Sequence, residues 1–171
     1  LGRVTSIIKP SDSRERPTLS FEYTVAVPLS TVTTRARERS GTDETLDKVV
    51  LVDGFGRSRA TFSEDAQAGN WIMSGYSSLD ARGNAMFAAY PAEVTALSLP
   101  SSTAAALAGT VTLHDALGRV TTLRHPDNTE ARTEYGAIEQ TIWDENDSDQ
   151  TSMHYGTPTT RQYDGLGRLT S

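Results

Sequence analysis

The stretch Tyr163-Asp164-Gly165-Leu166-Gly167-Arg168-Leu169 decides the fold, because the chain repeats it. The pattern returns as Val52-Asp53-Gly54-Phe55-Gly56-Arg57-Ser58 and as His114-Asp115-Ala116-Leu117-Gly118-Arg119-Val120. A fourth copy, Leu79-Asp80-Ala81-Arg82-Gly83-Asn84-Ala85, carries Asn84 in place of the arginine. The shared core is Asp-x-x-Gly-Arg, preceded by an apolar or large residue. Recurrence of this core within one chain favours a repeat architecture over a set of unrelated turns.

Each residue of this core suits a tight turn between two strands. The Asp carboxylate can accept hydrogen bonds from backbone amides a few residues further on, and the glycine supplies the positive φ that a tight return needs. The arginine begins the outgoing strand, where its guanidinium can reach a carboxylate or an aromatic ring of a neighbouring strand. The residues predicted to form these structural turns are Asp53, Gly56, Arg57, Asp80, Gly83, Asp115, Gly118, Arg119, Tyr163, Asp164, Gly167 and Arg168.

The two ends of the chain also carry the repeat. Leu1-Gly2-Arg3-Val4-Thr5-Ser6 matches Leu166-Gly167-Arg168-Leu169-Thr170-Ser171 apart from one exchange of Val for Leu. We therefore expect residues 1–171 to be one repeat segment of a longer protein. Because the copies are unevenly spaced, we also expect insertions or divergent units between them.

The motif Tyr-Asp-x-x-Gly-Arg resembles the signature of the Rhs or YD-repeat family. Four further stretches are similar to the B component of bacterial insecticidal toxin complexes, and they lie at residues 70–75, 124–130, 143–147 and 156–159. The resemblance extends over roughly residues 50–171. In that family the repeats wind into a hollow shell of β-strands around a toxic C-terminal region. The resemblance therefore implies an all-β array of antiparallel hairpins, forming a curved, single-layer segment of such a shell.

The same resemblance implies a structural role in a secreted bacterial virulence protein. Its expected partners are neighbouring repeats of the parent chain and the enclosed C-terminal toxin polypeptide, and a pore-forming toxin subunit is a further candidate. Adhesive members of the wider family suggest an alternative, a module that binds carbohydrate or a cell surface. Self-cleavage in the family belongs to a region after the repeats, and no equivalent motif occurs in this sequence. We therefore do not expect an enzyme.

Composition agrees with a soluble domain that has a modest core. Hydrophobic residues make up 36% of the chain and charged residues 22%, and the mean hydropathy is −0.43. No apolar run approaches the roughly 20 residues that span a bilayer. The absence of cysteine excludes disulfides and zinc-thiolate sites. A net charge of −6 argues against nucleic acid as the main partner.

Alternating residues predict a series of short strands joined by tight turns. The clearest lies at 19–27, where Pro28 should end it. Further strands are expected at 32–39, 48–52, 59–63, 85–90, 110–114, 120–124, 130–135, 140–143 and 159–163. We expect about ten to twelve strands, mostly antiparallel, because short turns join antiparallel neighbours. One helix is predicted at 103–108, with Ser101 or Ser102 as its cap and Gly109 at its end. Exposed loops are expected at 10–17 and 144–156.

Few residues suggest catalysis or metal binding. The histidines His114, His125 and His154 are scattered, and their spacing is not typical of zinc ligands. The acidic run at 144–149 begins like a calcium-binding loop, but it lacks the expected glycine and the final glutamate, so a solvated acidic loop is favoured. We expect no metal and no cofactor.

Three other features have both a binding and a structural interpretation. Arg35, Arg37 and Arg39 could form a basic stripe for an anion or a sugar acid, but charges on an exposed or edge strand are commoner. Trp71, Tyr76 and Trp143 could stack on a sugar, whereas packing within the sheets is the simpler explanation. The Gly-x-Gly sequences at 54–56 and 165–167 lack the third glycine and the helix of a phosphate site, which favours turns.

Overall fold

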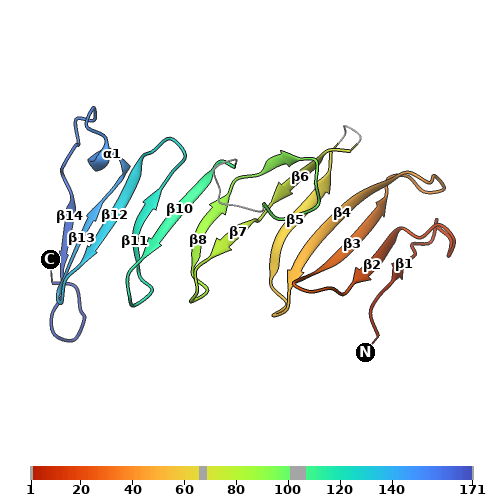
Figure 1. Cartoon of the computed structure of the whole chain (residues 1–171), viewed down its shortest axis with the longest axis horizontal. Coiled ribbons are helices and arrows are strands. Elements are labelled where there is room, and N and C mark those ends of the chain that lie inside the picture. Colours follow the sequence, from red (N-terminus) through yellow and green to blue (C-terminus); the bar gives the residue numbers. More distant parts are fainter. Residues whose placement is uncertain (1, 66–68, 101–106, 171) are drawn as a thin grey trace. The chain divides into compact units, whose positions relative to one another are not determined.

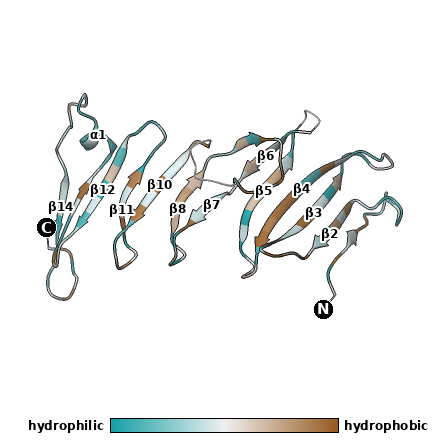
Figure 2. Ribbon diagram, in the orientation of Figure 1, coloured by the Kyte–Doolittle hydropathy of each residue, from teal (hydrophilic) through white to brown (hydrophobic). Residues whose placement is uncertain are grey.

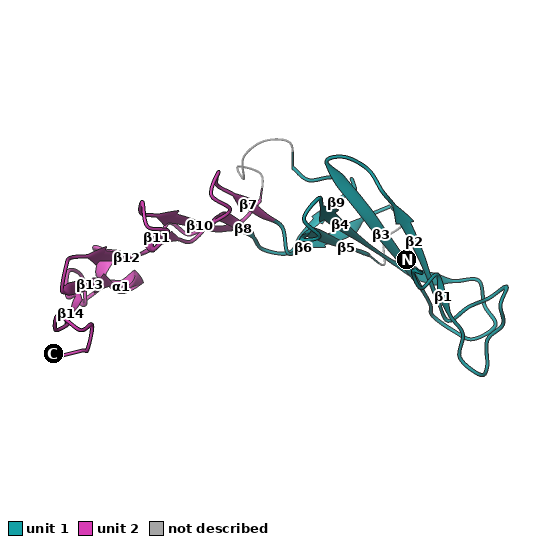
Figure 3. Ribbon diagram, turned by 90° about the horizontal axis from the view of Figure 1, so that it is seen from below, with its two compact units in different colours: residues 1–76, 89–105 teal, residues 77–88, 106–171 magenta. Residues whose placement is uncertain are grey.

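A computed structural model describes residues 2–65, 69–100 and 107–170. The predicted all-β, antiparallel fold is confirmed (Figure 1). The described residues form fourteen strands and one short helix, and the strands make two open seven-stranded sheets. The chain divides into two compact units, Leu1–Tyr76 with Ala89–Ala105 and Ser77–Ala88 with Ala106–Ser171 (Figure 3). We call them unit 1 and unit 2.

The first sheet has the strand order β1-β2-β3-β4-β5-β6-β9. Its strands are β1 (Ser6–Ile7), β2 (Leu19–Thr24), β3 (Leu29–Arg37), β4 (Thr45–Asp53), β5 (Ser58–Glu64), β6 (Trp71–Ser74) and β9 (Ala92–Val94). Hairpins join β2 through β6 in sequence order. β9 returns to pair with β6 only after the chain has contributed a hairpin to the other sheet.

The second sheet has the strand order β14-β13-β12-β11-β10-β8-β7. Its strands are β7 (Ser77–Leu79), β8 (Ala85–Ala89), β10 (Gly109–His114), β11 (Val120–Arg124), β12 (Glu130–Tyr135), β13 (Glu139–Trp143) and β14 (Thr159–Gln162). The helix α1 (Glu145–Ser148) follows β13 and contacts β12 and β13. The loop after β14 and the turns of β7–β8 and β10–β11 lie at the same end of the strands of this sheet, and α1 lies at the opposite end (Figure 1).

Unit 1 holds nearly all of the buried apolar side chains in the described part of the chain. Val49 of β4 pairs with Phe62 of β5, and Phe62 pairs with Met73 of β6, so the three side chains share one face of the sheet. Phe62 is 0% exposed and Met73 is 1% exposed. Figure 2 shows a strongly hydrophobic stretch along β4, the central strand of this sheet. The unit is thus held together mainly by β4, β5 and β6.

Unit 2 has a much smaller core. Among its described residues, Phe87 is the only one with a buried large apolar side chain. The charged residues of β10 to β13 all lie on one face of the sheet, because the strands pair in register; they are Arg124, Glu130, Arg132, Glu134 and Glu139. The other face of these four strands carries neutral residues such as Thr112, Leu123 and Tyr135. These four strands therefore carry all their own charged residues on one face. On the other face, positive charge comes from Arg119, which stacks on Tyr135, and from Arg161 of β14, which pairs with Gln140.

The strand predictions agree with the structure best where a strand leaves a turn. The predicted bounds 120–124 and 130–135 are those of β11 and β12. The strand expected at 19–27 ends earlier, at Thr24, because residues 25–28 make the turn into β3 through a cis Val27–Pro28 peptide. The strand expected at 32–39 is longer at its start and shorter at its end. Strands β1, β6, β7 and β9 were not predicted.

Two predicted segments differ in character from the structure. The helix expected at 103–108 lies mostly outside the described residues, and Gly109 begins β10 instead of ending a helix. The loop expected at 144–156 contains α1, because Asp144 and Asp147 form a reciprocal capping box. The loop at 10–17 is held in place by hydrogen bonds, among them those from Ser40 to Asp12 and from Arg16 to Gly41.

Candidate functional site

The repeated turn has one backbone geometry in all four copies. The Asp carbonyl accepts a hydrogen bond from the Gly amide, and the Asp amide donates to the carbonyl four residues on, with N···O distances of 2.8 to 3.0 Å. The glycines have positive φ, as the turn interpretation predicted, with values of 79° at Gly56, 89° at Gly83, 80° at Gly118 and 76° at Gly167. Only glycine adopts this region at little cost, which explains its place in the motif.

The Asp carboxylate joins the two arms of the turn. In the β10–β11 turn, Asp115 Oδ1 accepts from the amides of Leu117 at 2.8 Å and Arg119 at 3.0 Å. Its Oδ2 accepts from Arg119 Nε at 2.7 Å. The same three bonds occur around Asp53 and Asp164. One carboxylate thus satisfies two backbone amides that the turn itself leaves unpaired.

The degenerate copy keeps this arrangement with a different donor. Asn84 stands where the other turns have arginine, and its Nδ2 donates to Asp80 Oδ2 at 2.9 Å. The amides of Arg82 and Asn84 donate to Asp80 Oδ1. The turn therefore needs a side-chain donor at the fifth position rather than a positive charge.

A fifth turn of the same geometry joins β11 to β12 and was not recognised as a copy in the sequence. Here His125 takes the Asp position: its amide donates to Thr129 O, and its carbonyl accepts from Asn128 N, both at 3.0 Å. Asn128 takes the Gly position with a φ of 68°. Asn tolerates this region better than other residues with a Cβ atom. The backbone bonds join residues three and four positions apart, as in the other turns. The sequence does not reveal this, because the residue types at these positions differ from the motif.

The position expected for the arginine side chains is correct only in part. Arg119 lies 4.2 Å from the centre of the Tyr135 ring on β12, as expected for a contact with a neighbouring strand. All three arginines also bond the Asp of their own turn, and Arg57 lies over Phe55 of the same turn. The reason is proximity, because the fifth residue of the turn stands directly across from its first.

At two places, a tyrosine hydroxyl bonds the carbonyl of the residue that follows the repeat arginine. Tyr135 Oη donates to Val120 O at 3.1 Å, while Arg119 stacks on the ring. The first repeat of the chain shows the same pair of contacts. Tyr23 Oη donates to Val4 O at 3.0 Å, and Arg3 lies 5.2 Å from the ring centre. An Arg followed by an apolar residue thus binds a tyrosine at both places. Tyr163, by contrast, donates to Gln140 Oε1.

The turn carboxylates have pKa values below the ordinary 3.8. Backbone amide donation from Arg119 and Arg168 is the main cause that lowers the pKa of Asp115 and Asp164, and the Asn84 side chain is the main cause at Asp80. At Asp53 partial desolvation acts in the opposite direction, but the bonds from Arg57 and Phe55 together outweigh it and lower the pKa.

This lowering predicts acid sensitivity of the fold. In the folded state these carboxylates hold fewer protons than in the unfolded state, so their contribution to stability is complete above the ordinary pKa of 3.8 and is lost as pH falls through the lowered folded pKa. We expect the urea midpoint to be steady between about pH 5 and pH 7 and to fall below about pH 4. Asp115→Asn should flatten part of that fall. A midpoint that rises on acidification would contradict the assignment.

Gly118 offers a direct test of the positive φ. A Cβ atom there would meet only Asn84 Oδ1, at 3.8 Å, so packing would not change. Gly118→Val is expected to lower the free energy of unfolding by about 1–2 kcal/mol through left-handed strain alone, measured by urea denaturation. Gly118→Asn should cost less, since Asn128 already holds this conformation. Gly165→Val is the matched control, because Gly165 has no positive φ and no neighbour within 4 Å. An equal loss of stability in the two Val variants would show that left-handed strain at position 118 is not the cause.

The three histidines occupy three different settings. His114 precedes Asp115 in a repeat turn, His125 Nε2 lies 3.3 Å from Glu145 Oε1, and His154 is exposed. Within the described ranges, no group of three or more His, Asp or Glu side chains is arranged to hold a metal ion. In the same part of the chain, no helix is long and apolar enough to cross a membrane.

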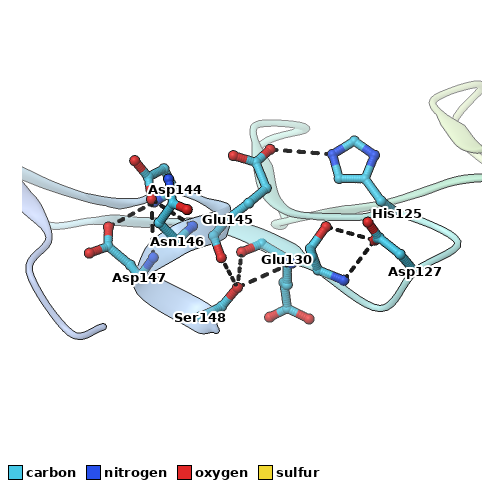
Figure 4. A network of polar contacts seen from close by, with 9 residues as sticks. His125, Asp127, Glu130, Asp144, Glu145, Asn146, Asp147 and Ser148 are labelled. Carbon is cyan, nitrogen blue, oxygen red and sulfur yellow. Dashed lines mark hydrogen bonds and ion pairs between the residues drawn. The ribbon is translucent and has the colours of Figure 1, made fainter. Parts of the chain in front are cut away.

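The acidic run at 144–149 forms a capped helix that is tied to the neighbouring hairpin (Figure 4). Asp144 Oδ1 accepts from the amides of Asn146 and Asp147, and Asp147 Oδ2 accepts from the amide of Asp144 at 2.9 Å. Ser148 Oγ donates to Glu130 O at 2.7 Å. Asp147 is only 7% exposed, so the expectation of a solvated loop is wrong at this residue, while Asp144 and Asp149 are exposed as expected. Its carboxylate has a structural use that the calcium hypothesis did not consider.

The remaining candidates are built into the sheets. β3 lies between β2 and β4, so of the two alternatives expected for Arg35 and Arg37, an exposed strand or an edge strand, the edge strand is wrong. Arg35 is paired with Glu22 at 3.1 Å and with Asp47 at 3.3 Å. Among the aromatic residues, Tyr76 is buried and Trp143 is covered on one side by Arg132. The Gly-x-Gly sequences at 54–56 and 165–167 are parts of repeat turns.

Comparison with known proteins identifies solved structures with this fold. No protein-family model and no curated protein matches the sequence. A crystal structure of TcdB2-TccC3 superposes with a TM-score of 0.72 at 19% identity, over 94% of this chain and 10% of that chain. TcdB2-TccC3 without its hypervariable C-terminal region gives 0.68 at 19% identity, over 82% and 8%. The Photorhabdus luminescens Tc holotoxin pore gives 0.67 at 19% identity, over 82% and 8%.

The chain spans a tenth or less of the length of the structures it matches. Their likeness covers both sheets, since it extends over most of this chain. At 19% identity the shared property is the arrangement of strands. The chain therefore has the fold of a segment of the TcdB2-TccC3 toxin-complex structures, as its resemblance to the Rhs or YD-repeat family led us to expect.

Proposed function

We propose that this chain is a structural wall segment of a toxin-related β-shell, and that it has no catalytic role of its own. The observation that carries the proposal is the construction of unit 2. Its strands β10 to β13 form an open sheet whose charged strand residues all lie on one face, whereas the other face carries neutral strand residues, with Arg119 stacked on Tyr135 and Arg161 of β14 beside Gln140. An open antiparallel sheet whose two faces differ suits a partition between two different environments.

The turn motif supports the same role. Its carboxylates, arginines and glycines are engaged in hydrogen bonds within the turn or in the conformation of its backbone. These groups hold the hairpins in place, so they are not available to bind or react with a substrate. The motif is therefore a device for repeating a strand pair of fixed geometry.

The proposal extends to partners and location. The matched structures are described as TcdB2-TccC3 complexes and a Tc holotoxin pore, and one lacks a hypervariable C-terminal region. By analogy we propose that neighbouring repeats flank this segment, that its parent protein is secreted by bacteria, and that the wall encloses a C-terminal toxin or processed polypeptide. The face of β10 to β13 that has no charged strand residue would face the enclosed chain, because a lining of low charge binds an unfolded polypeptide only weakly through charge.

A segment exchange tests the proposal. Residues 1–171 would replace the matching segment of TcdB2-TccC3, and digestion of the hypervariable C-terminal region by proteinase K would be followed with time. We expect the region to be as resistant as in the unmodified complex. The control exchange carries Phe62→Ala and Gly109→Ala, which should damage both sheets and expose the region.

Two results would count against a wall function. The first is a chimera that assembles, as judged by electron microscopy, but leaves the C-terminal region open to digestion. The second is glycan binding by the isolated chain at micromolar affinity, which would favour the carbohydrate-binding alternative.

A further inference from the structure

The charged face of unit 2 contains a depression of about 280 Å³ where α1 and the segment after it fold back over β12 and β13. Its walls include Arg132 and Trp143, which are directly paired across the two strands, and Tyr155 from the segment that follows α1. Glu130 stands at its rim, two residues along β12 from Arg132. This volume is enough for one or two side chains and lies at the lower limit, about 300 Å³, of pockets that hold drug-sized ligands.

The aromatic residues of the depression are only partly covered by the protein. Tyr155 is 53% exposed, and Trp143 is half-buried. The Arg132 guanidinium lies 4.1 Å from the centre of the Trp143 ring, with its side chain 47% exposed. This contact shows that a cation is accommodated against the indole, which is the most favourable aromatic ring for such a contact.

The charge around the depression is negative in sum, although Arg132 in its wall and Arg124, paired with Glu130 at 2.9 Å, are positive. Residues 133–160 contain six acidic side chains and no Lys or Arg; the acidic residues are Glu134, Glu139, Asp144, Glu145, Asp147 and Asp149. Their sum equals the net charge of the whole chain, −6, so the rest of the chain is balanced. A cationic partner is therefore attracted to this part of the surface in preference to the remainder of the chain.

The outer wall of the depression is fixed by a buried carboxylate. Asp147 Oδ1 accepts from the amide and the hydroxyl of Thr157, at 2.8 and 3.0 Å. The Asp147 carbonyl accepts from the amide of Gly156, the residue after Tyr155. Binding would therefore cost little ordering of this segment.

We propose that this depression binds an extended, basic segment of a partner polypeptide, which places one apolar or aromatic side chain between Trp143 and Tyr155 and its Lys or Arg side chains near the surrounding carboxylates. The small volume argues for a side chain as the occupant, and the local charge argues for its basic neighbours. The inference concerns the charged face and does not depend on what the opposite face encloses.

Fluorescence titration of the full chain tests this site. The Trp71→Phe variant leaves Trp143 as the only tryptophan. The probe is the blocked peptide acetyl-Leu-Arg-Leu-Arg-Leu-amide, with the Glu-containing counterpart acetyl-Leu-Glu-Leu-Glu-Leu-amide as its control. We expect a saturable change in Trp143 emission with the basic peptide, with a dissociation constant on the order of 100 µM, and no change with the acidic one. Raising NaCl from about 50 to about 500 mM should weaken binding.

Surface variants localise the effect without disturbing the fold. In the Trp71→Phe background, Tyr155→Ala should weaken binding about tenfold and Glu130→Gln about threefold. Phe55→Ala removes an aromatic side chain that is 88% exposed on a turn of unit 1, and it should leave the affinity unchanged. Equal binding of both peptides, an unchanged affinity in Tyr155→Ala, or a response to a chitin trisaccharide alone would each overturn the proposal.

Discussion

Replacing Phe62 with alanine is expected to lower the free energy of unfolding of unit 1 by about 3–5 kcal/mol. The Phe62 side chain is fully buried, and its strand β5 lies between β4 and β6. The register places it beside Val49 on one side and Met73 on the other, so its removal leaves a cavity across three strands. A sheet with so few buried side chains has little else to refill that space.

Urea denaturation followed by far-ultraviolet circular dichroism measures this loss. Phe55→Ala is the matched control, because Phe55 is 88% exposed at the tip of the β4–β5 turn and its removal should cost less than about 0.5 kcal/mol. The two variants remove the same atoms, in one case from a buried side chain and in the other from an exposed one. Similar midpoints for both would show that the β4–β6 face does not stabilise the unit.

The repeat turns could be predicted because their structure is local. Asp115, Gly118 and Arg119 interact within five residues, so the sequence alone contains both partners of each bond. The fifth turn escaped recognition because His125 and Asn128 keep the backbone bonds while changing the residue types. Backbone geometry is thus more constant in this chain than the motif that first reveals it.

The pairing of β6 with β9 could not be predicted from local patterns. The two strands are separated by the β7–β8 hairpin, which belongs to the other sheet. β9 is also only three residues long, which is too short for an alternating pattern to stand out. Non-local pairing of this kind depends on the rest of the sheet, and no turn residue marks it.

The helix α1 had a signal in the sequence that was given a different meaning. Asp144 and Asp147 have the spacing of a capping box, with Asp in place of the usual Ser or Thr and of Glu. The acidic run was interpreted as a loop because its carboxylates were counted as surface charges. The depression beside Trp143 follows from this helix and from the return of segment 149–158, so it was also missing from the sequence interpretation.

Gly109 was expected to end a helix, but the structure gives it another reason to be glycine. It is the first residue of β10, it is buried, and its φ is not in the left-handed region. A Cβ atom at this position would overlap the carbonyl oxygen of Ala88 and would lie 2.5 Å from Phe87 Cζ. The approach of β10 to β8 therefore requires a residue without a side chain.

Gly109→Ala is accordingly expected to lower the stability of unit 2 by about 3 kcal/mol, measured by urea denaturation. Gly165→Ala adds the same methyl group where nothing lies within 4 Å, and it should be nearly neutral. Phe87→Leu combined with Gly109→Ala should cost less than the sum of the two single changes, because a smaller side chain removes one of the two obstacles. Since the Ala88 carbonyl remains as the second obstacle, full recovery in the double variant would contradict the close backbone approach.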